Sequence, residues 1–271
     1  MFNLKGKTAI VTGVAGGLAQ GMGIALAEAG ADIAGIDIKE MDETKRRVES
    51  LGRSFWGFRQ NLMEINAIPD LVAAIIEQTG RIDILINCAG ISDSGFEPQH
   101  ITWDEYTFVM DINLNSMVKL SIEAYKRMLA QGTGGKIINI TSILAFLPTS
   151  GSLAYATSKN GIIGMTKVFA AAGAQHGIWV NAVAPGSIVT DMLKGVYGAK
   201  AEGDGITTDD SGERIYHSDT MPARRMGTPN DLKGIAIYLA SPESDFLSGQ
   251  VICADGGIQN GNRFYMFHEF E

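Results

Sequence analysis

Three polar residues, Ser142, Tyr155 and Lys159, have the types and spacing of a proton-transfer site. A tyrosine phenol is a poor acid or base near neutral pH, because its unperturbed pKa lies roughly three units too high. Lys159 stands at i+4 from Tyr155, so on a helix its ammonium shares the face of the phenol and favours the phenolate. Ser142 ends an expected strand, where its hydroxyl can hold a substrate oxygen. Together with the glycine-rich, phosphate-cradling segment Thr12–Gly17 upstream, these residues indicate a hydride-transfer enzyme.

A glycine-rich segment, Thr12–Ala19, directly follows the expected strand Thr8–Val11. Glycines let the backbone approach a pyrophosphate, and the N-terminus of the following helix presents free N–H groups to it. Alone, such a turn is unspecific, because any tight strand-to-helix turn favours glycine. In its strand–turn–helix context it predicts a dinucleotide site. The predicted loop contacts are Gly13, Gly16, Gly17 and Leu18.

Asp37 ends the second expected strand, about 20 residues past the glycines, where a carboxylate can accept hydrogen bonds from both adenosine ribose hydroxyls. The same carboxylate would repel a 2′-phosphate. The glycine loop contains no Arg or Lys, and the first base after Asp37 is Lys39. The sequence therefore predicts NAD (NADH) as the cofactor and disfavours NADP. That Asp37 merely starts a turn is the structural alternative.

Short apolar runs alternate along the chain with segments of helical period, which implies a parallel sheet covered by helices on both faces. The expected strands are Thr8–Val11, Asp32–Ile36, Phe55–Phe58, Ile82–Ile86, Lys136–Ile140, Trp179–Val183 and Gln250–Cys253. The expected helices are Leu18–Ala29, Met41–Leu51, Ala67–Gln78, Trp103–Leu129, Ala154–Gln175 and Asn230–Leu239. This predicts an α/β fold, a single Rossmann-type doubly wound domain over 1–271 with a parallel sheet of about seven strands.

Composition excludes several classes of function. The net charge of −8 argues against nucleic acid and anionic membranes as partners. Cys88 and Cys253 lie in apolar segments and are predicted to be buried reduced thiols, and no His/Cys cluster has metal-ligand spacing. The first strand leaves no room for a signal peptide, and no apolar run reaches bilayer length. A soluble, cytoplasmic protein without a metal is expected.

The polar stretch at 192–220 interrupts the alternation and is predicted to be a substrate lid. Between Met192 and Asp219 it carries six acidic and three basic residues, which suits an anionic sugar acid poorly, although one well-placed Arg suffices. A partly apolar substrate pocket is predicted from Phe96, Leu144 and Met192, together with Ser142 and Tyr155. The alternative is that Phe96, Leu144 and Met192 are core residues.

Taken in order, the motifs resemble the short-chain dehydrogenase/reductase family over nearly the full chain. Each motif alone is unspecific, whereas the ordered set is specific. The matching segments are Thr12–Ala19, Asn87-Cys88-Ala89-Gly90, Asn113, Ser142, Tyr155-x-x-x-Lys159 and Asn181–Gly186. Cys88 stands where the family usually has a second Asn, and its apolar flank argues against a nucleophilic role.

The resemblance implies a catalytic tetrad of Asn113, Ser142, Tyr155 and Lys159. Tyr155 would donate or accept the substrate proton, and Lys159 would hold the nicotinamide ribose and lower the pKa of Tyr155. Ser142 would bind the reacting oxygen, and Asn113 would position a water that connects Lys159 to solvent. The further cofactor contacts that it implies are Asn61, Leu62, Asn87, Ala89, Gly90, Tyr155, Lys159, Pro185, Gly186, Ile188 and Thr190.

Within the family, the segments Gly17–Met22 and Ala130–Asn139 resemble the 2-deoxy-D-gluconate 3-dehydrogenase group. The implied activity is NAD-dependent interconversion of a secondary alcohol and a ketone, on a sugar, sugar-acid derivative or cyclic alcohol. A non-catalytic NAD(H)-binding redox sensor on the same fold is the alternative. Enoyl reduction is a weaker option, because that branch typically separates Tyr and Lys by six residues, against three here.

Two expectations concern assembly. The resemblance implies a homotetramer with an interface formed by the helices at Trp103–Leu129 and Ala154–Gln175. The C-terminal tail, 258–271, is rich in aromatic residues, so we expect it to pack at a subunit interface or over a substrate pocket. A disordered terminus is the alternative.

Overall fold

The structure, a computed structural model, describes residues 1–93, 95, 97–193, 205–208, 214–218 and 221–260. Its principal strands are β1 (Thr8–Thr12), β2 (Asp32–Asp37), β3 (Phe55–Arg59), β4 (Ile84–Asn87), β5 (Gly135–Ile140), β6 (Ile178–Pro185) and β9 (Val251–Ala254). Its α-helices are α1 (Gly17–Glu28), α2 (Asp42–Ser50), α3 (Ile68–Thr79), α4 (Trp103–Met110), α5 (Ser116–Gln131), α6 (Leu153–Gly173) and α8 (Lys233–Ala240).

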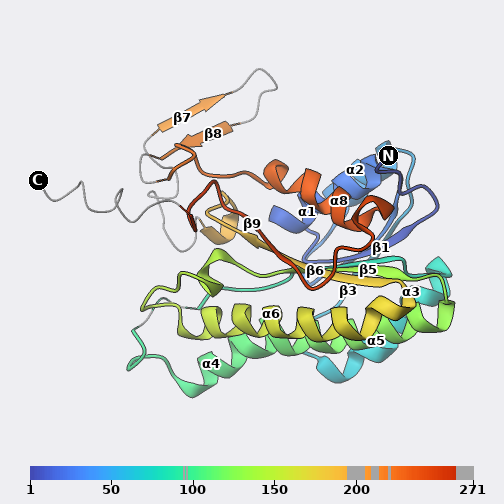
Figure 1. Cartoon of the computed structure of the whole chain (residues 1–271), viewed down its shortest axis with the longest axis horizontal. Helices are drawn as coiled ribbons and strands as arrows, with labels where there is room; N and C mark the ends of the chain where they lie inside the picture. The colour runs from blue at the N-terminus through green and yellow to red at the C-terminus, as the bar shows by residue number, and fades with distance from the viewer. Residues whose placement is uncertain (94, 96, 194–204, 209–213, 219–220, 261–271) are drawn as a thin grey trace, which may run out of the picture.

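The seven strands form one parallel sheet in the order β3-β2-β1-β4-β5-β6-β9. Helices α1, α2 and α8 cover one face, and α3, α5 and α6 cover the other (Figure 1). The chain leaves β1 for β2 and β3 and then returns to β4 on the other side of β1. The predicted doubly wound sheet of seven strands is confirmed, and the reversal beside β1 is the place where such sheets bind ligands.

Both faces of the sheet are buried, so its strands carry apolar residues at successive positions. In β4, Ile84 and Ile86 belong to the core under α1 and α8, and Leu85 between them belongs to the core under α3 and α5. This period of two follows from the pleat of a strand. It explains why these strands appear in the sequence as unbroken apolar runs.

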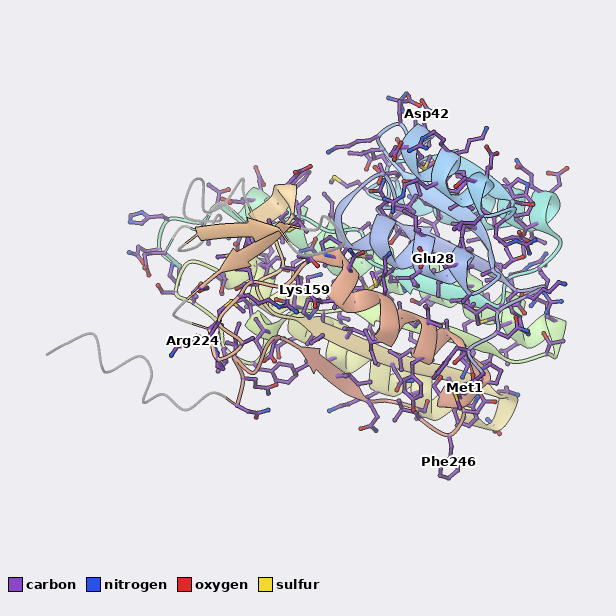
Figure 2. All side chains as sticks on the ribbon, turned by 90° about the horizontal axis from the view of Figure 1, so that it is seen from above. Met1, Glu28, Asp42, Lys159, Arg224 and Phe246 are labelled. Atoms are coloured by element: carbon purple, nitrogen blue, oxygen red, sulfur yellow. The ribbon has the colours of Figure 1, made fainter. Side chains whose placement is uncertain are left out.

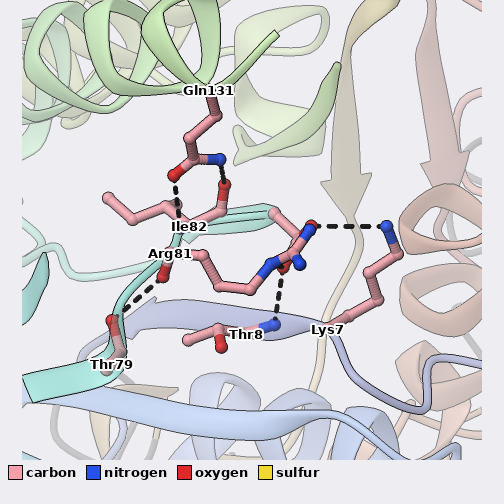
Figure 3. Close-up of polar contacts among 7 residues, drawn as sticks. Lys7, Thr8, Thr79, Arg81, Ile82 and Gln131 are labelled. Atoms are coloured by element: carbon pink, nitrogen blue, oxygen red, sulfur yellow. Dashed lines mark hydrogen bonds and ion pairs between the residues drawn. The ribbon is translucent and has the colours of Figure 1, made fainter. Parts of the chain in front are cut away.

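The start of β4 differs from the prediction, which began the strand at Ile82. The backbone N–H and C=O of Ile82 bond instead to the side-chain amide of Gln131, at 2.9 Å (N to Oε1) and 2.8 Å (Nε2 to O) (Figure 3). Beside them, the buried Asp83 carboxylate accepts from Thr8 N at 2.9 Å and pairs with Lys7 and Arg81. Polar side chains therefore occupy the groups that would have extended the strand.

The predicted helix Trp103–Leu129 is interrupted. Between α4 and α5, residues Asp111–Asn115 form a wider π-helical turn. Single π turns within helices occur frequently at functional sites. Asn113 lies at the centre of this turn, fully buried, and is the residue expected to join the proton relay.

The 192–220 segment contains an element that the sequence analysis did not predict. Strands β7 (Gly205–Thr208) and β8 (Arg214–His217) form an antiparallel pair. The lid function of this segment stays a prediction. The expected substrate contact Phe96, and the tail from residue 261 onward, lie outside the described residues. Within the described ranges, no helix is long and apolar enough to cross a membrane.

Candidate active site

Two adjoining cavities lie at the carboxyl ends of the strands. The first has a volume of about 420 Å³ and follows β1, β2, β3 and β4, and the second, of about 200 Å³, follows β5 and β6. Five residues line both: Leu18, Cys88, Gly90, Thr190 and Met192. The first cavity lies at the reversal of strand order, where open α/β sheets bind their ligands.

The glycine loop forms the floor of the first cavity. Gly13 has a φ of +77°, and a Cβ on it would lie 3.1 Å from Ala89 Cα, so this position requires glycine. Helix α1 begins at Gly17, and its first turn has no acidic residue. Its N-cap residue, Gly16, has no side chain that could cap the helix. An exposed helix N-terminus without its own negative charge fits the pyrophosphate of a dinucleotide.

Asp37 braces this loop and also borders the cavity. Its Oδ2 accepts from Ala15 N at 2.9 Å, and its Oδ1 accepts from Lys39 N at 2.9 Å. Thr44, which is fully buried, donates from Oγ1 to Val14 O at 2.8 Å. The bonds from Ala15 N and Lys39 N fix the orientation of the Asp37 carboxylate, which would hold the adenosine ribose.

Nearly all predicted cofactor contacts border one of the two cavities. The first is lined by Gly13, Gly16, Gly17, Leu18, Asp37, Asn61, Leu62, Ala89 and Gly90, and the second by Tyr155, Lys159, Pro185, Gly186, Ile188 and Thr190. Asn87 is different: it is 1% exposed, and its Nδ2 donates to Ser121 Oγ and Asn139 Oδ1 at 2.9 and 2.8 Å. Its side chain supports the sheet below the cavity instead of lining it.

Tyr155 and Lys159 come together in the second cavity, both from α6. Lys159 Nζ lies 5.3 Å from the Tyr155 ring centroid and donates to Ile140 O at 3.1 Å. The lysine is 3% exposed and lies in the interior of the molecule, whereas Asp42 and Phe246 lie at its periphery (Figure 2). Burial disfavours the ammonium and lowers the pKa of Lys159 to about 8. A modest change in surroundings can thus change its charge.

Ser142 lines the same cavity and begins a short 3₁₀ turn at Ile143–Ala145. Its Oγ accepts from Leu144 N at 3.1 Å. A hydroxyl that accepts in this way keeps its own hydrogen for another acceptor. Ser142 can therefore donate to a substrate oxygen held near Tyr155.

Asn113 lies beside this pair without lining the cavity. Its Oδ1 accepts from Ile91 N at 2.8 Å, and its Nδ2 donates to Ile91 O and Ser158 Oγ at 2.8 and 3.2 Å. A Cβ on Gly90 would lie 3.0 Å from Asn113 Oδ1 and 3.6 Å from Lys159 Nζ. Gly90 thus leaves room for the Asn113 amide, with Lys159 close by. The water-positioning role of Asn113 stays a prediction.

Cys88 and Cys253 are free thiols, as predicted, but both are only partly buried, in contrast to the prediction. Cys88 follows the end of β4, and Cys253 belongs to the edge strand β9, so neither is enclosed on all sides. Desolvation raises the pKa of Cys88 to about 12. Its thiol therefore stays protonated near neutral pH, which agrees with the expected absence of a nucleophilic role.

The predicted substrate contacts within the described residues, Ser142, Leu144, Tyr155 and Met192, all line the second cavity. Part of the wall of the first cavity was not predicted from the sequence: Ile38, Lys39, Gln60, Met63, Ile91, Ile112 and Asp191. Most of these follow the carboxyl ends of expected strands. That position was the available signal, because ligands of open parallel sheets bind there.

Comparison with known proteins shows the family to which the chain belongs. A family model described as enoyl-(acyl carrier protein) reductase matches residues 13–259. The 2-dehydro-3-deoxy-D-gluconate 5-dehydrogenase of Escherichia coli K12 is 40% identical over 258 residues, 94% of this chain and 96% of the relative. A short-chain type dehydrogenase/reductase from Mycobacterium marinum has a similar structure, with a TM-score of 0.84, 28% identity, and coverage of 94% and 96%. The chain belongs to the short-chain dehydrogenase/reductase family.

One further similar structure bears on the cofactor. A candidate 2-deoxy-D-gluconate 3-dehydrogenase from Agrobacterium tumefaciens is 29% identical, with a TM-score of 0.81 and coverage of 94% of this chain and 97% of that chain. Its structure contains bound NADP. Membership of the short-chain dehydrogenase/reductase family therefore supports a nicotinamide cofactor without deciding between NAD and NADP.

Proposed function

We propose that the protein is an NAD-dependent oxidoreductase that interconverts a secondary alcohol and a ketone, with Tyr155 as general acid and base. The observation that carries this proposal is the wall shared by the two cavities. The glycine loop and Asp37 border one cavity, and Ser142, Tyr155 and Lys159 border the other. A nicotinamide that extends across the shared wall would meet a substrate beside the tyrosine.

The bound nicotinamide supplies the site that accepts or donates the hydride. In the oxidative direction Tyr155 takes the proton of the substrate hydroxyl, and in the reductive direction it returns the proton to the carbonyl oxygen. The Lys159 ammonium, when protonated, stabilises the phenolate of Tyr155. Ser142 donates to the substrate oxygen and stabilises the charge that develops on it.

NAD is proposed over NADP because the Asp37 carboxylate borders the first cavity and is held there by two backbone N–H groups. Asp37→Asn keeps an acceptor oxygen but removes the charge that would face a 2′-phosphate. Because like charges placed together cost several kcal/mol, this change should raise the NADP-to-NAD ratio of kcat/KM by about tenfold or more. Steady-state rates with both cofactors measure the ratio.

The matched control for this experiment is Asp42→Asn, at the exposed start of α2, which should leave the ratio unchanged. If the wild-type protein preferred NADP, the proposed role of Asp37 would be wrong. Lys39 provides the reason to test this directly, since it also lines the first cavity and carries a charge that suits a phosphate.

For the substrate we propose a sugar-acid derivative of the 2-dehydro-3-deoxy-D-gluconate type, the compound named in the relative from Escherichia coli. The second cavity supports a polyhydroxylated substrate, because Ser92, Ser142, Ser187 and Thr190 line it. The test is NAD-linked oxidation of 2-dehydro-3-deoxy-D-gluconate beside a neutral polyol and a cyclic alcohol. Turnover of the neutral compounds alone would overturn the sugar-acid assignment and leave the reaction class intact.

A redox sensor would bind NADH without turning over any of these compounds. It would need the first cavity only, whereas the protein also carries Ser142, Tyr155 and Lys159 in the second. Enoyl reduction is disfavoured by the three-residue interval between Tyr155 and Lys159. We therefore place the alcohol–ketone reaction first.

A homotetramer in the cytoplasm is part of the proposal. Trp103 on α4 and Val168 on α6 are large apolar side chains that are 73% and 70% exposed. They belong to the helices from which the interface was expected. Their exposure supports burial between subunits.

A further inference from the structure

The helix that carries Tyr155 and Lys159 lacks a cap from its own N-cap residue. Helix α6 begins at Leu153, and Ser152 stands at the N-cap position. The Ser152 hydroxyl donates to Thr149 O at 2.8 Å and accepts from Thr149 N at 3.1 Å, and it makes no bond to the first turn of α6. The backbone N–H groups of that turn need another acceptor.

Asp93 supplies this acceptor from a distant part of the chain. Its Oδ2 accepts from the backbone N of Tyr155 at 3.0 Å. Tyr155 is the third residue of α6, so its N–H is one that an N-cap side chain ordinarily satisfies. The Asp93 carboxylate also brings a negative charge to the positive end of the helix, where it is stabilising.

We propose that Asp93 is a positioning residue that replaces the missing N-cap of α6 and holds Tyr155 in place for proton transfer. This inference rests on the proposed function of Tyr155. Asp93 acts through the backbone of Tyr155, and it does not line either cavity, so it needs no contact with the reacting atoms.

The surrounding loops strengthen this connection. The Ser150 hydroxyl donates to Glu97 Oε1 at 2.7 Å, and a Cβ on Gly151 would lie 2.5 Å from Gly95 O. The loop after β4 is therefore packed closely against the segment that precedes α6. The same loop contributes Gly90 and Ser92 to the second cavity. Asp93 thus joins the cavity wall to the helix that carries the catalytic tyrosine.

Two substitutions separate the hydrogen bond from the charge. Asp93→Asn keeps an oxygen that can cap the helix, and Asp93→Ala removes both cap and charge. Asp93 and Lys159 are titratable groups beside Tyr155, and Cys88 and Glu97 are further titratable groups on the loop after β4. Both variants lose the negative charge, so any change in the pH–rate profile that comes from the charge is the same in the two. A difference between the two variants therefore measures the effect of losing the hydrogen bond to Tyr155 N.

The experiment measures kcat with 2-dehydro-3-deoxy-D-gluconate and NAD, and amide hydrogen exchange at Tyr155 in the protein without ligands. We expect Asp93→Ala to lower kcat by about tenfold or more with little change in the KM for NAD, since small misplacements of a catalytic group are costly. Exchange at Tyr155 should become about tenfold faster or more. Asp93→Asn should restore both values to within about threefold of wild type.

Ser150→Ala is the matched control, because it removes the bond to Glu97 and leaves the bond between Asp93 and Tyr155. Unchanged exchange at Tyr155 in Asp93→Ala, or equal damage in the two Asp93 variants, would overturn the proposal. If wild type shows no turnover of any tested alcohol, the proposed function fails, and the exchange measurement still decides whether Asp93 caps α6.

Discussion

Replacing Tyr155 by phenylalanine should lower kcat by about a thousandfold or more while the affinity for NADH stays within about threefold of wild type. The phenol is the group placed to exchange a proton with the substrate oxygen, beside the Ser142 hydroxyl and the Lys159 amine. Phenylalanine keeps the ring and its packing. The glycine loop and Asp37, which would hold most of the dinucleotide, border the other cavity and are unaffected.

Initial rates and NADH fluorescence titration measure these two quantities. Tyr106→Phe is the matched control, because Tyr106 lies on α4, stacked on Trp103, and lines neither cavity. Tyr106→Phe should leave both kcat and the affinity for NADH unchanged. Wild-type turnover in Tyr155→Phe would remove this tyrosine from the mechanism.

Replacing Lys159 by methionine should lower kcat by about a hundredfold or more, because a cation that stabilises developing negative charge is lost. The same change should increase the stability of the folded protein. Lys159 is 3% exposed, and burial lowers its pKa to about 8 from an ordinary value of 10.5. This difference corresponds to about 3 kcal/mol of destabilisation wherever the buried amine must be charged.

The pH dependence follows from the number of bound protons. Between pH 8 and 10.5 the unfolded wild-type chain holds a proton on Lys159 that the folded protein has released, so wild-type stability rises with pH relative to the variant. Any stability advantage of Lys159→Met is therefore largest below pH 8 and shrinks as the pH rises through this interval. Urea unfolding of both proteins without ligands, from pH 6 to 10, measures the difference.

Lys167→Met provides the matched control, since Lys167 is an exposed lysine on the same helix. It should change neither kcat nor the pH dependence of stability. A stability difference between wild type and Lys159→Met that does not vary with pH would contradict the inferred burial of the Lys159 ammonium.

The regular part of the fold could be predicted from the sequence because both faces of its strands are buried. Runs such as that of β1 are buried at every position and largely apolar, and they alternate with helices of ordinary length. The limits of β4 could not be predicted, because they depend on Gln131, 49 residues away, which bonds to the backbone of Ile82. Local patterns contain no signal for such a distant partner.

The same distinction applies to the site. The glycine loop, Asp37 and the Tyr155/Lys159 pair could be predicted because each depends on spacing within one or two elements. Asp93 could not, since its role depends on the contact between the loop after β4 and the start of α6. The β7–β8 pair was missed because its sequences, Gly-Ile-Thr-Thr and Arg-Ile-Tyr-His, are not the apolar runs that indicated strands of equal length such as β4 and β9.

The π turn at Asp111–Asn115 makes the site unusually dependent on the number of residues in one segment. Such a turn is equivalent to one additional residue within an α-helix, and each residue of a helix turns the chain by about 100°. Deleting a single residue here would allow continuous α-helix from α4 to α5 with both helices kept in phase, and the residues of the turn itself would lose their present direction. Asn113 would then point away from Ile91 and Lys159. In this segment, the length of the chain matters more to the proton relay than the identity of most side chains.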